Sequence, residues 1–138
     1  MILIYILINI IILAMTSFKF DPSKPGLRKT LKEYQELALR FVWEMGEEGA
    51  NSGDVWRAVN ERLGEGKSIS RASILFFLND MVDDGVLRCK EATGKGGHYR
   101  VFFPVLDEAG YRMYLLRTVI DSMMRDYPVE TRKVLKEY

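Results

Sequence analysis

The chain of 138 residues is poor in the side chains that hold metals and disulfides, because it has one cysteine, Cys89, and one histidine, His98. A single cysteine excludes a disulfide framework and an all-cysteine metal cluster within the chain. A single histidine argues against a zinc site built on histidines. Strong net charge is also absent, since 20 lysine and arginine residues face 19 acidic ones for a net charge of +1. Any attraction to nucleic acid must therefore come from local segregation of charge.

Signatures of catalysis are missing as well. No paired carboxylates, no nucleophile with a base and no group of metal ligands stands at a spacing typical of an enzyme. The glycine-rich segment at 93–97 (TGKGG) lacks the spacing of a phosphate-binding loop and precedes a strand-like run. We therefore expect no enzymatic activity, no cofactor and no metal, and we interpret His98 and Cys89 as ordinary strand residues.

Residues 2–15 (ILIYILINIIILAM) form an almost uninterrupted apolar run. A helix of this length reaches roughly 21 Å, which is less than the roughly 30 Å of a bilayer core. Three interpretations stay open for residues 1–18. The run is upstream translation before a true start at Met15, a membrane anchor, or an apolar segment buried in an oligomer interface. Basic residues follow the run. If the run is a membrane anchor, they keep the folded part at the cytoplasmic face of the membrane, so we expect the folded part to lie in the cytoplasm.

The rest of the chain predicts three short helices after a linker at 19–29, which contains Asp-Pro and Lys-Pro-Gly. Apolar residues recur at spacings of three and four, as on the buried face of a helix. The first helix runs from the N-cap Thr30 to Gly46 or Gly49, the second follows Asn51-Ser52 and closes at Gly64, and the third runs from Ser68 or Ser70 to Gly85. With this pattern, Ile74, Phe77, Leu78 and Met81 form the inner stripe of the third helix.

After Gly85 the pattern changes to that of strands. Runs at 86–92 and 98–103 flank the glycine-rich segment and predict a β-hairpin that Pro104 ends. Asp107 then begins a long helix to about Tyr127, and Pro128 interrupts it before residues 129–138 resume. Three short helices, a hairpin and a long helix are typical of a winged helix-turn-helix, which is an α+β, mostly helical fold.

The stretch ISRASILFFLNDMVDDGVLRCKEATGKGGHYRVFFPV resembles the recognition helix and wing of the penicillinase-repressor (BlaI/MecI) family, and it is similar to the PadR and MarR winged-helix repressors. The shared features are a serine-rich start of the helix, Gly85 before Val86-Leu87, and an aromatic second strand that ends near Pro104. The resemblance covers about residues 30 to 125. It implies a homodimeric repressor that binds double-stranded DNA through its third helix and wing.

Carried over residue by residue, the resemblance assigns Ser70, Arg71 and Ser73 to contacts with phosphates and bases, and Lys95 to the wing tip. Basic side chains around the third helix and the hairpin are predicted to bind phosphates as well, because both elements meet the DNA backbone in a winged helix. The complete predicted DNA-binding set is Lys67, Ser68, Ser70, Arg71, Ser73, Phe76, Arg88, Lys90, Lys95 and Arg100.

Two departures from the family lie on the third helix. Leu75 and Phe76 stand where the penicillinase repressors place polar or basic side chains, and Asp80, Asp83 and Asp84 follow where basic residues are commoner. If the predicted inner stripe is right, Leu75 and Phe76 point outward, toward thymine methyl groups or another protein. A helix rotated by one position buries Phe76 instead.

The long helix has an apolar stripe broader than a single domain needs, which predicts burial against a second copy. The predicted dimer contacts are Tyr111, Tyr114, Leu115, Val119 and Met123. The expected domains are an apolar segment at 1–18, a linker at 19–29, a DNA-binding winged helix at 30–104 and a dimerisation region at 105–138. The alternative function is a winged-helix protein-interaction module, tethered to a membrane through residues 1–18, because the net charge is near zero and apolar residues face outward.

Overall fold

The computed structural model describes residues 2–4 and 18–138. Residues 1 and 5–17 lie outside this description, so it does not test the three interpretations of the apolar segment at 1–18. Among the residues that are described, no helix has the length and apolar character needed to cross a membrane. Packing divides the chain into two units, Met1–Val105 and Leu106–Tyr138.

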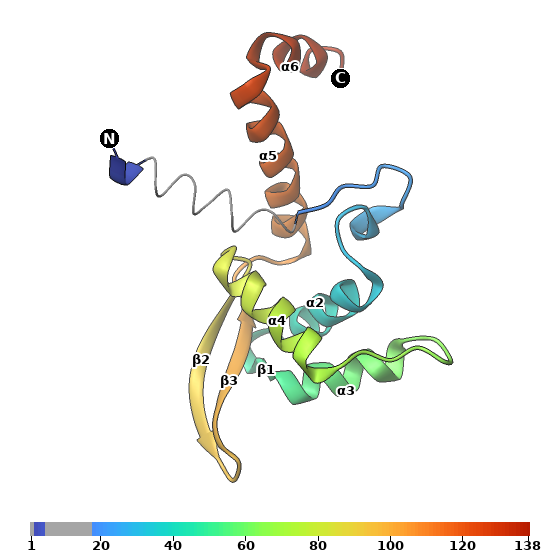
Figure 1. Cartoon of the computed structure of the whole chain (residues 1–138), viewed down its shortest axis with the longest axis vertical. Helices are drawn as coiled ribbons and strands as arrows, with labels where there is room; N and C mark the ends of the chain where they lie inside the picture. The colour runs from blue at the N-terminus through green and yellow to red at the C-terminus, as the bar shows by residue number, and fades with distance from the viewer. Residues whose placement is uncertain (1, 5–17) are drawn as a thin grey trace. The chain divides into compact units, whose positions relative to one another are not determined.

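The first unit contains the three predicted helices, and Figure 1 shows them together above and beside the hairpin. A short 3-10 helix, η1 (Gly26–Lys29), comes first. The α-helices are α2 (Glu33–Met45), α3 (Ser52–Arg62) and α4 (Arg71–Asp83). A second 3-10 turn, η2 (Gly46–Glu48), follows α2. All three helices are confirmed, and Gly46 ends α2 with a φ of 56° that other residues rarely adopt.

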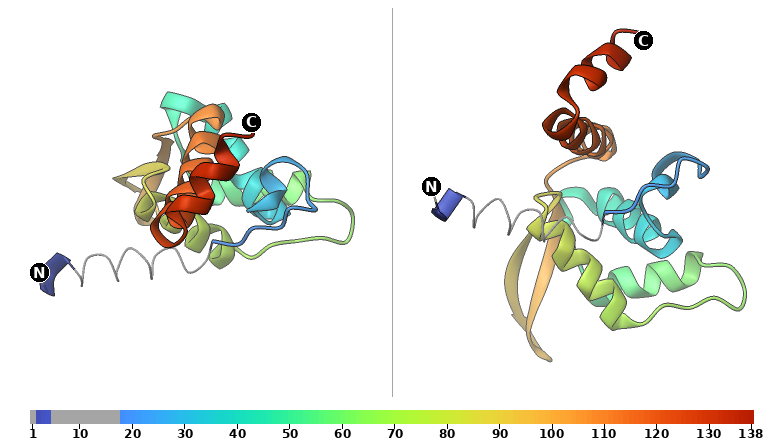
Figure 2. Two further views of the ribbon diagram at one scale, coloured as in Figure 1. Left: turned by 90° about the horizontal axis from the view of Figure 1, so that it is seen from above. Right: turned by 45° about the horizontal axis from the view of Figure 1, so that its top comes forward.

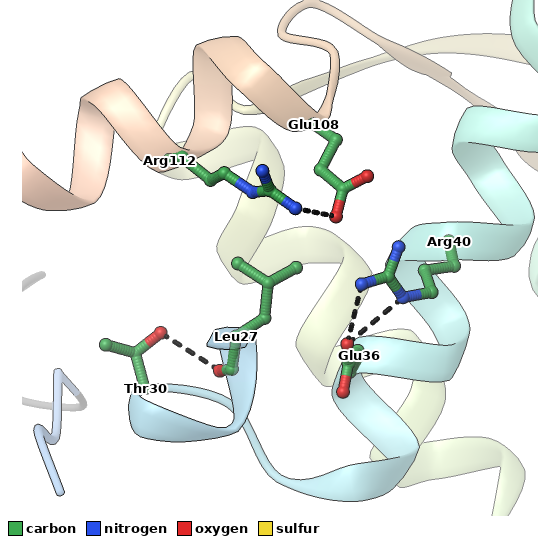
Figure 3. A network of polar contacts seen from close by, with 6 residues as sticks. All are labelled: Leu27, Thr30, Glu36, Arg40, Glu108 and Arg112. Carbon is green, nitrogen blue, oxygen red and sulfur yellow. Dashed lines mark hydrogen bonds and ion pairs between the residues drawn. The ribbon is translucent and has the colours of Figure 1, made fainter. Parts of the chain in front are cut away.

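The start of α2 differs from the prediction. The side chain of Gln35 accepts a hydrogen bond from the backbone N–H of Lys32 at 2.9 Å, so the helix begins at Glu33 and not after Thr30. Thr30 instead closes η1, where its hydroxyl donates to the carbonyl of Leu27 at 3.4 Å (Figure 3). Leu27 is buried, so the segment predicted as a linker contains a turn that is anchored in the core.

Side-chain caps fix the starts of the other two helices. Asn51 Oδ1 accepts from the N–H of Asp54 at 2.8 Å, and Ser70 Oγ accepts from the N–H of Ser73 at 3.1 Å. Each bond satisfies one of the N–H groups that the first turn of a helix leaves without a partner. Of the two serines predicted to begin the third helix, Ser70 is therefore the N-cap.

The sheet has three antiparallel strands in the order β1-β3-β2. The hairpin strands are β2 (Leu87–Gly94) and β3 (Gly97–Pro104), and they extend beyond the helices as a two-stranded ribbon in both Figure 1 and Figure 2. Gly94 pairs with Gly97, so the turn is tighter than the five glycine-rich residues predicted. The sequence did not predict β1 (Ala50–Asn51), which pairs with β3 through Ala50 and Phe102.

The core of this unit lies where the helices meet the inner face of the sheet. Phe102, Leu39, Ile74 and Leu78 are among its largest fully buried side chains. Ile74, Phe77, Leu78 and Met81 of α4 are all buried, which confirms the predicted inner stripe. Three helices with a hairpin after the third make this an α+β, mostly helical winged helix, as the sequence predicted.

The second unit consists of α5 (Glu108–Asp126) and α6 (Pro128–Leu135). Asp107 caps α5 by accepting from the N–H of Gly110 at 2.7 Å, and Arg112 pairs with Glu108 one turn apart at 2.9 Å (Figure 3). Pro128 occupies the first turn of α6, where its missing N–H costs nothing. The predicted long helix from Asp107 to about Tyr127 is confirmed.

Candidate nucleic-acid interface

The turn between α3 and α4 is held by hydrogen bonds to both backbone groups of Ile69. Trp56 Nε1 donates to the carbonyl of Ile69 at 2.9 Å, and Asn60 Oδ1 accepts from its N–H at 3.0 Å. Asn60 Nδ2 also donates to the carbonyl of Trp56 at 2.8 Å. These bonds fix the angle at which α4 leaves the turn, and no local pattern in the sequence marks them because they join residues 13 and 9 positions apart.

Three of the predicted contact residues gather at the start of α4. Ser70 Oγ caps the helix and donates to Ser73 Oγ at 2.9 Å, so both serines are already engaged in shaping the first turn. The exposed guanidinium of Arg71 lies 5.9 Å from the ring centre of Trp56. This cation–π contact holds a positive charge beside the N-terminus of α4, where the helix dipole also favours an anion.

The outward face of α4 is apolar near its start and acidic near its end. Leu75 is 38% exposed and Phe76 is 69% exposed, so both point outward and the rotated alternative is wrong. Asp80 and Asp83 are exposed further along the helix. At the C-cap, burial and, to a smaller extent, the neighbouring charges of Asp80 and Asp83 together raise the pKa of Asp84 to about 6.

The pairing of β2 with β3 divides the cations of the wing between two faces. Arg88 and Lys90 lie on one face, where the Arg88 guanidinium is 4.4 Å and the Lys90 ammonium 5.7 Å from the ring centre of Phe103. Ala92 and its partner Tyr99 continue this face toward the turn. Lys95 is exposed in the turn itself. Arg88, Lys90 and Tyr99 thus lie along one side of the wing and Lys95 lies at its tip. All four side chains can form hydrogen bonds with a nucleic-acid backbone.

Arg100 lies on the opposite face of the wing. Its Nε donates to Glu91 Oε1 at 3.1 Å and its Nη1 donates to Asn79 Oδ1 at 3.0 Å. Arg100, which the sequence predicted as a phosphate contact, thus links the wing to α4 in the structure. Glu91 and Asn79 were not predicted to take part, since no local pattern marks a pair that forms between a strand and a helix.

Two further predicted residues lie on the loop before α4. Lys67 pairs with Glu33 of α2 at 3.0 Å, and Ser68 is exposed. An exposed pair of this kind contributes about 0 to 1 kcal/mol, so Lys67 can exchange Glu33 for another anion at small cost. Within residues 2–4 and 18–138, no three His, Cys, Asp or Glu side chains come together to hold a metal ion.

The residues predicted for the dimer differ in exposure. Tyr111 is buried in the single chain and stacks on Tyr114 at 5.8 Å, so it presents no surface to a second copy. Leu115 and Val119 are half-buried and Met123 is exposed. The most exposed apolar side chains of α5 also include Met113 and Leu116, which the prediction left out.

Among the solved structures that resemble this chain are two of low sequence identity. One is a possible transcriptional regulator from Methanosarcina mazei Go1, with a TM-score of 0.49 and 8% identity over 78% of this chain and 79% of that chain. The other is a candidate transcriptional regulator from Thermoplasma acidophilum, with a TM-score of 0.44 and 17% identity over 67% of this chain and 93% of that chain. No family model and no curated protein matches the chain.

Proposed function

We propose that this chain is a DNA-binding transcriptional regulator, with α4 in the major groove and the β2–β3 wing along the neighbouring backbone. The observation that carries the proposal is the distribution of charge on the winged helix. Arg71 stands at the start of α4 and Lys95 at the wing tip, whereas Asp80, Asp83 and Asp84 stand at the far end of α4. An approach that leads with the start of α4 brings the cations to phosphates and keeps the carboxylates away from them.

The polar groups at the start of α4 support the same orientation. Ser70 and Ser73 hold the first turn in place, and the N–H groups of that turn add to the positive field of Arg71. Arg88 and Lys90, held against Phe103, provide two more cations on the wing. Each neutralised phosphate releases condensed counterions, so binding through these groups depends strongly on salt.

We also propose that the regulator acts as a homodimer and, following the resemblance to the penicillinase repressors, as a repressor. The support for dimerisation is the exposed apolar side of α5, where Met113, Leu116 and Met123 are each close to half exposed or more. Side chains of this kind at spacings of three and seven form a continuous stripe on a helix, and a second copy of α5 is its natural cover.

Selection from a pool of random duplexes tests the proposal directly. The purified chain should enrich a shared sequence, and its affinity for that duplex should fall linearly with the logarithm of salt concentration. Arg71→Glu should weaken binding at least about tenfold and reduce the salt slope by about 1, since it removes one phosphate contact. Lys136→Glu, the same change of charge at an exposed position after α6, is the matched control and should bind normally. Absence of any salt-dependent binding overturns the proposal.

One observation favours a second candidate function, a protein-interaction module. Phe76 is 69% exposed beside Leu75, and acidic side chains border this apolar pair. A basic and apolar segment of another protein fits such a surface. Under this alternative, Phe76→Glu abolishes binding to the partner while Arg71→Glu leaves it unchanged, whereas binding to DNA should be weakened by Arg71→Glu.

A further inference from the structure

The outward stripe of α4 carries an unusual order of side chains for a helix that enters a DNA groove. Positions separated by three and four residues lie on one side of a helix. On α4 this exposed or half-exposed side consists of Ala72, Leu75, Phe76, Asn79, Asp80 and Asp83. Its first two turns are therefore entirely apolar, and the first amide, that of Asn79, already accepts a hydrogen bond from Arg100 at 3.0 Å.

Resting on the proposed DNA binding, we infer that α4 recognises the C5-methyl group of thymine through Leu75 and Phe76. The major groove presents donors and acceptors at every base pair, but the C5-methyl is its only apolar group. Side chains without hydrogen-bonding atoms can discriminate bases only through that methyl. The nearest cation, Arg71, lies over Trp56, so it does not occupy the stripe.

The positions of the two side chains define how many bases they reach. Leu75 and Phe76 are consecutive, so they are offset by about 1.5 Å along the helix and by about 100° around it. Phe76 extends furthest into solvent, at 69% exposed against 38% for Leu75. Side chains in this arrangement fit the methyl groups of two adjacent base pairs, so we expect two neighbouring A·T pairs in the preferred sequence.

The carboxylates restrict the geometry of this contact. Asp80 and Asp83 continue the stripe on the third and fourth turns of α4, and phosphates line both walls of the major groove. Repulsion between these carboxylates and the phosphates is smallest when only the first two turns of α4 enter the groove. The part of the helix that reaches the bases is then the apolar part, which makes the methyl contact the main source of sequence preference.

A methyl at C5 has two sources in DNA, thymine and 5-methylcytosine, and base substitution separates them. In the duplex selected from the unmethylated random pool, each thymine is replaced in turn by deoxyuridine, which lacks only the methyl. We expect affinity to fall about fourfold at one or two adjacent positions and to stay unchanged elsewhere. Replacing a sensitive thymine with cytosine should weaken binding. Placing 5-methylcytosine at the same position should restore the part of the affinity that the methyl group contributes.

Variants of the stripe assign the effect to these side chains. Phe76→Ala should bind the thymine and deoxyuridine duplexes equally at the position that Phe76 contacts, because the group that senses that methyl is gone, and it should keep the difference at the position that Leu75 contacts. Arg71→Ala is the matched control, since it should weaken both duplexes alike and keep the fourfold ratio. Phe76 is exposed, so its replacement leaves the core intact, and circular dichroism checks that each variant is folded.

The possible failures are distinct. If no duplex is enriched, both the DNA-binding proposal and this inference are overturned. If the selected duplex binds with the expected salt dependence but deoxyuridine has no effect at any position, DNA binding stands and methyl recognition is overturned. If Phe76→Ala leaves every affinity unchanged, the inference is also overturned, and the apolar pair then belongs to a protein contact.

Discussion

Asp84 places a carboxyl group at an unfavourable position in the winged helix. It is the C-cap of α4, where its backbone N–H donates to the carbonyl of Asp80 at 2.9 Å. Burial and the charges of Asp80 and Asp83 raise its pKa to about 6. The negative end of the helix dipole opposes a charge there as well. Asp84→Asn keeps the shape of the side chain and removes the charge, so it should stabilise the protein wherever Asp84 is ionised.

The size and pH range of this effect follow from the shift of the pKa. An ordinary aspartate in the unfolded chain loses its proton near pH 3.8, whereas folded Asp84 keeps it until about 6. Folding is therefore favoured by the protonated group below about pH 4, and that contribution is lost as the pH rises through about 6. A shift of this size corresponds to about 3 kcal/mol, and the partial solvent exposure of Asp84 reduces it to the order of 1 kcal/mol.

Urea unfolding at about pH 4 and about pH 7.5 measures the effect through the free energy of unfolding. Relative to the wild type, Asp84→Asn should gain on the order of 1 kcal/mol more at the higher pH than at the lower pH. Asp83→Asn removes the same charge from an exposed neighbour and should change stability by less than about 0.5 kcal/mol at either pH. A gain that is equal at both pH values, or a loss at about pH 7.5, contradicts the assignment of a buried charge to Asp84.

Two further predictions concern the sheet and the dimer. Gly49→Ala should cost about 2 to 4 kcal/mol in chemical denaturation, because Gly49 has a φ of 72° and a Cβ there lies 2.6 Å from the ring of Phe103. Gly64→Ala, which meets nothing within 4 Å, is the control, and an equal loss in both variants refutes the steric reasoning. Leu116→Glu should convert the proposed homodimer to monomers in sedimentation experiments while Leu116→Met keeps it, and a wild-type chain that is monomeric at all concentrations refutes the proposed homodimer.

The start of α4 shows how far local patterns reach. A serine N-cap and an apolar residue at every third or fourth position are enough to predict the helix and its inner stripe, but a rotation by one position stayed open until the structure showed Leu75 and Phe76 pointing outward. The same reasoning placed the first helix too early, because Thr30 and Gln35 are both suited to capping. The structure uses Gln35 with Lys32, since Leu27 draws Thr30 into the preceding 3-10 turn.

The candidate interface was predicted less completely than the helices that carry it. Ser70, Arg71 and Ser73 do meet at the start of α4, because neighbours in a helix remain neighbours in space. The hydrogen bond between Arg100 and Asn79 was not predicted, since the two residues are 21 positions apart along the chain. The pair Lys67–Glu33 spans 34 residues and was equally invisible to a local pattern.

The order of the three helices, the hairpin and the long helix, and the inner stripe of α4, were determined by the sequence alone. Each depends on the periodicity of side chains within one element, where backbone geometry sets which residues share a face. Only the tertiary structure decided that Asn60 and Trp56 hold Ile69, that β1 joins the sheet, and which cations are paired. Those features depend on packing between distant segments, and no spacing along the chain specifies such contacts.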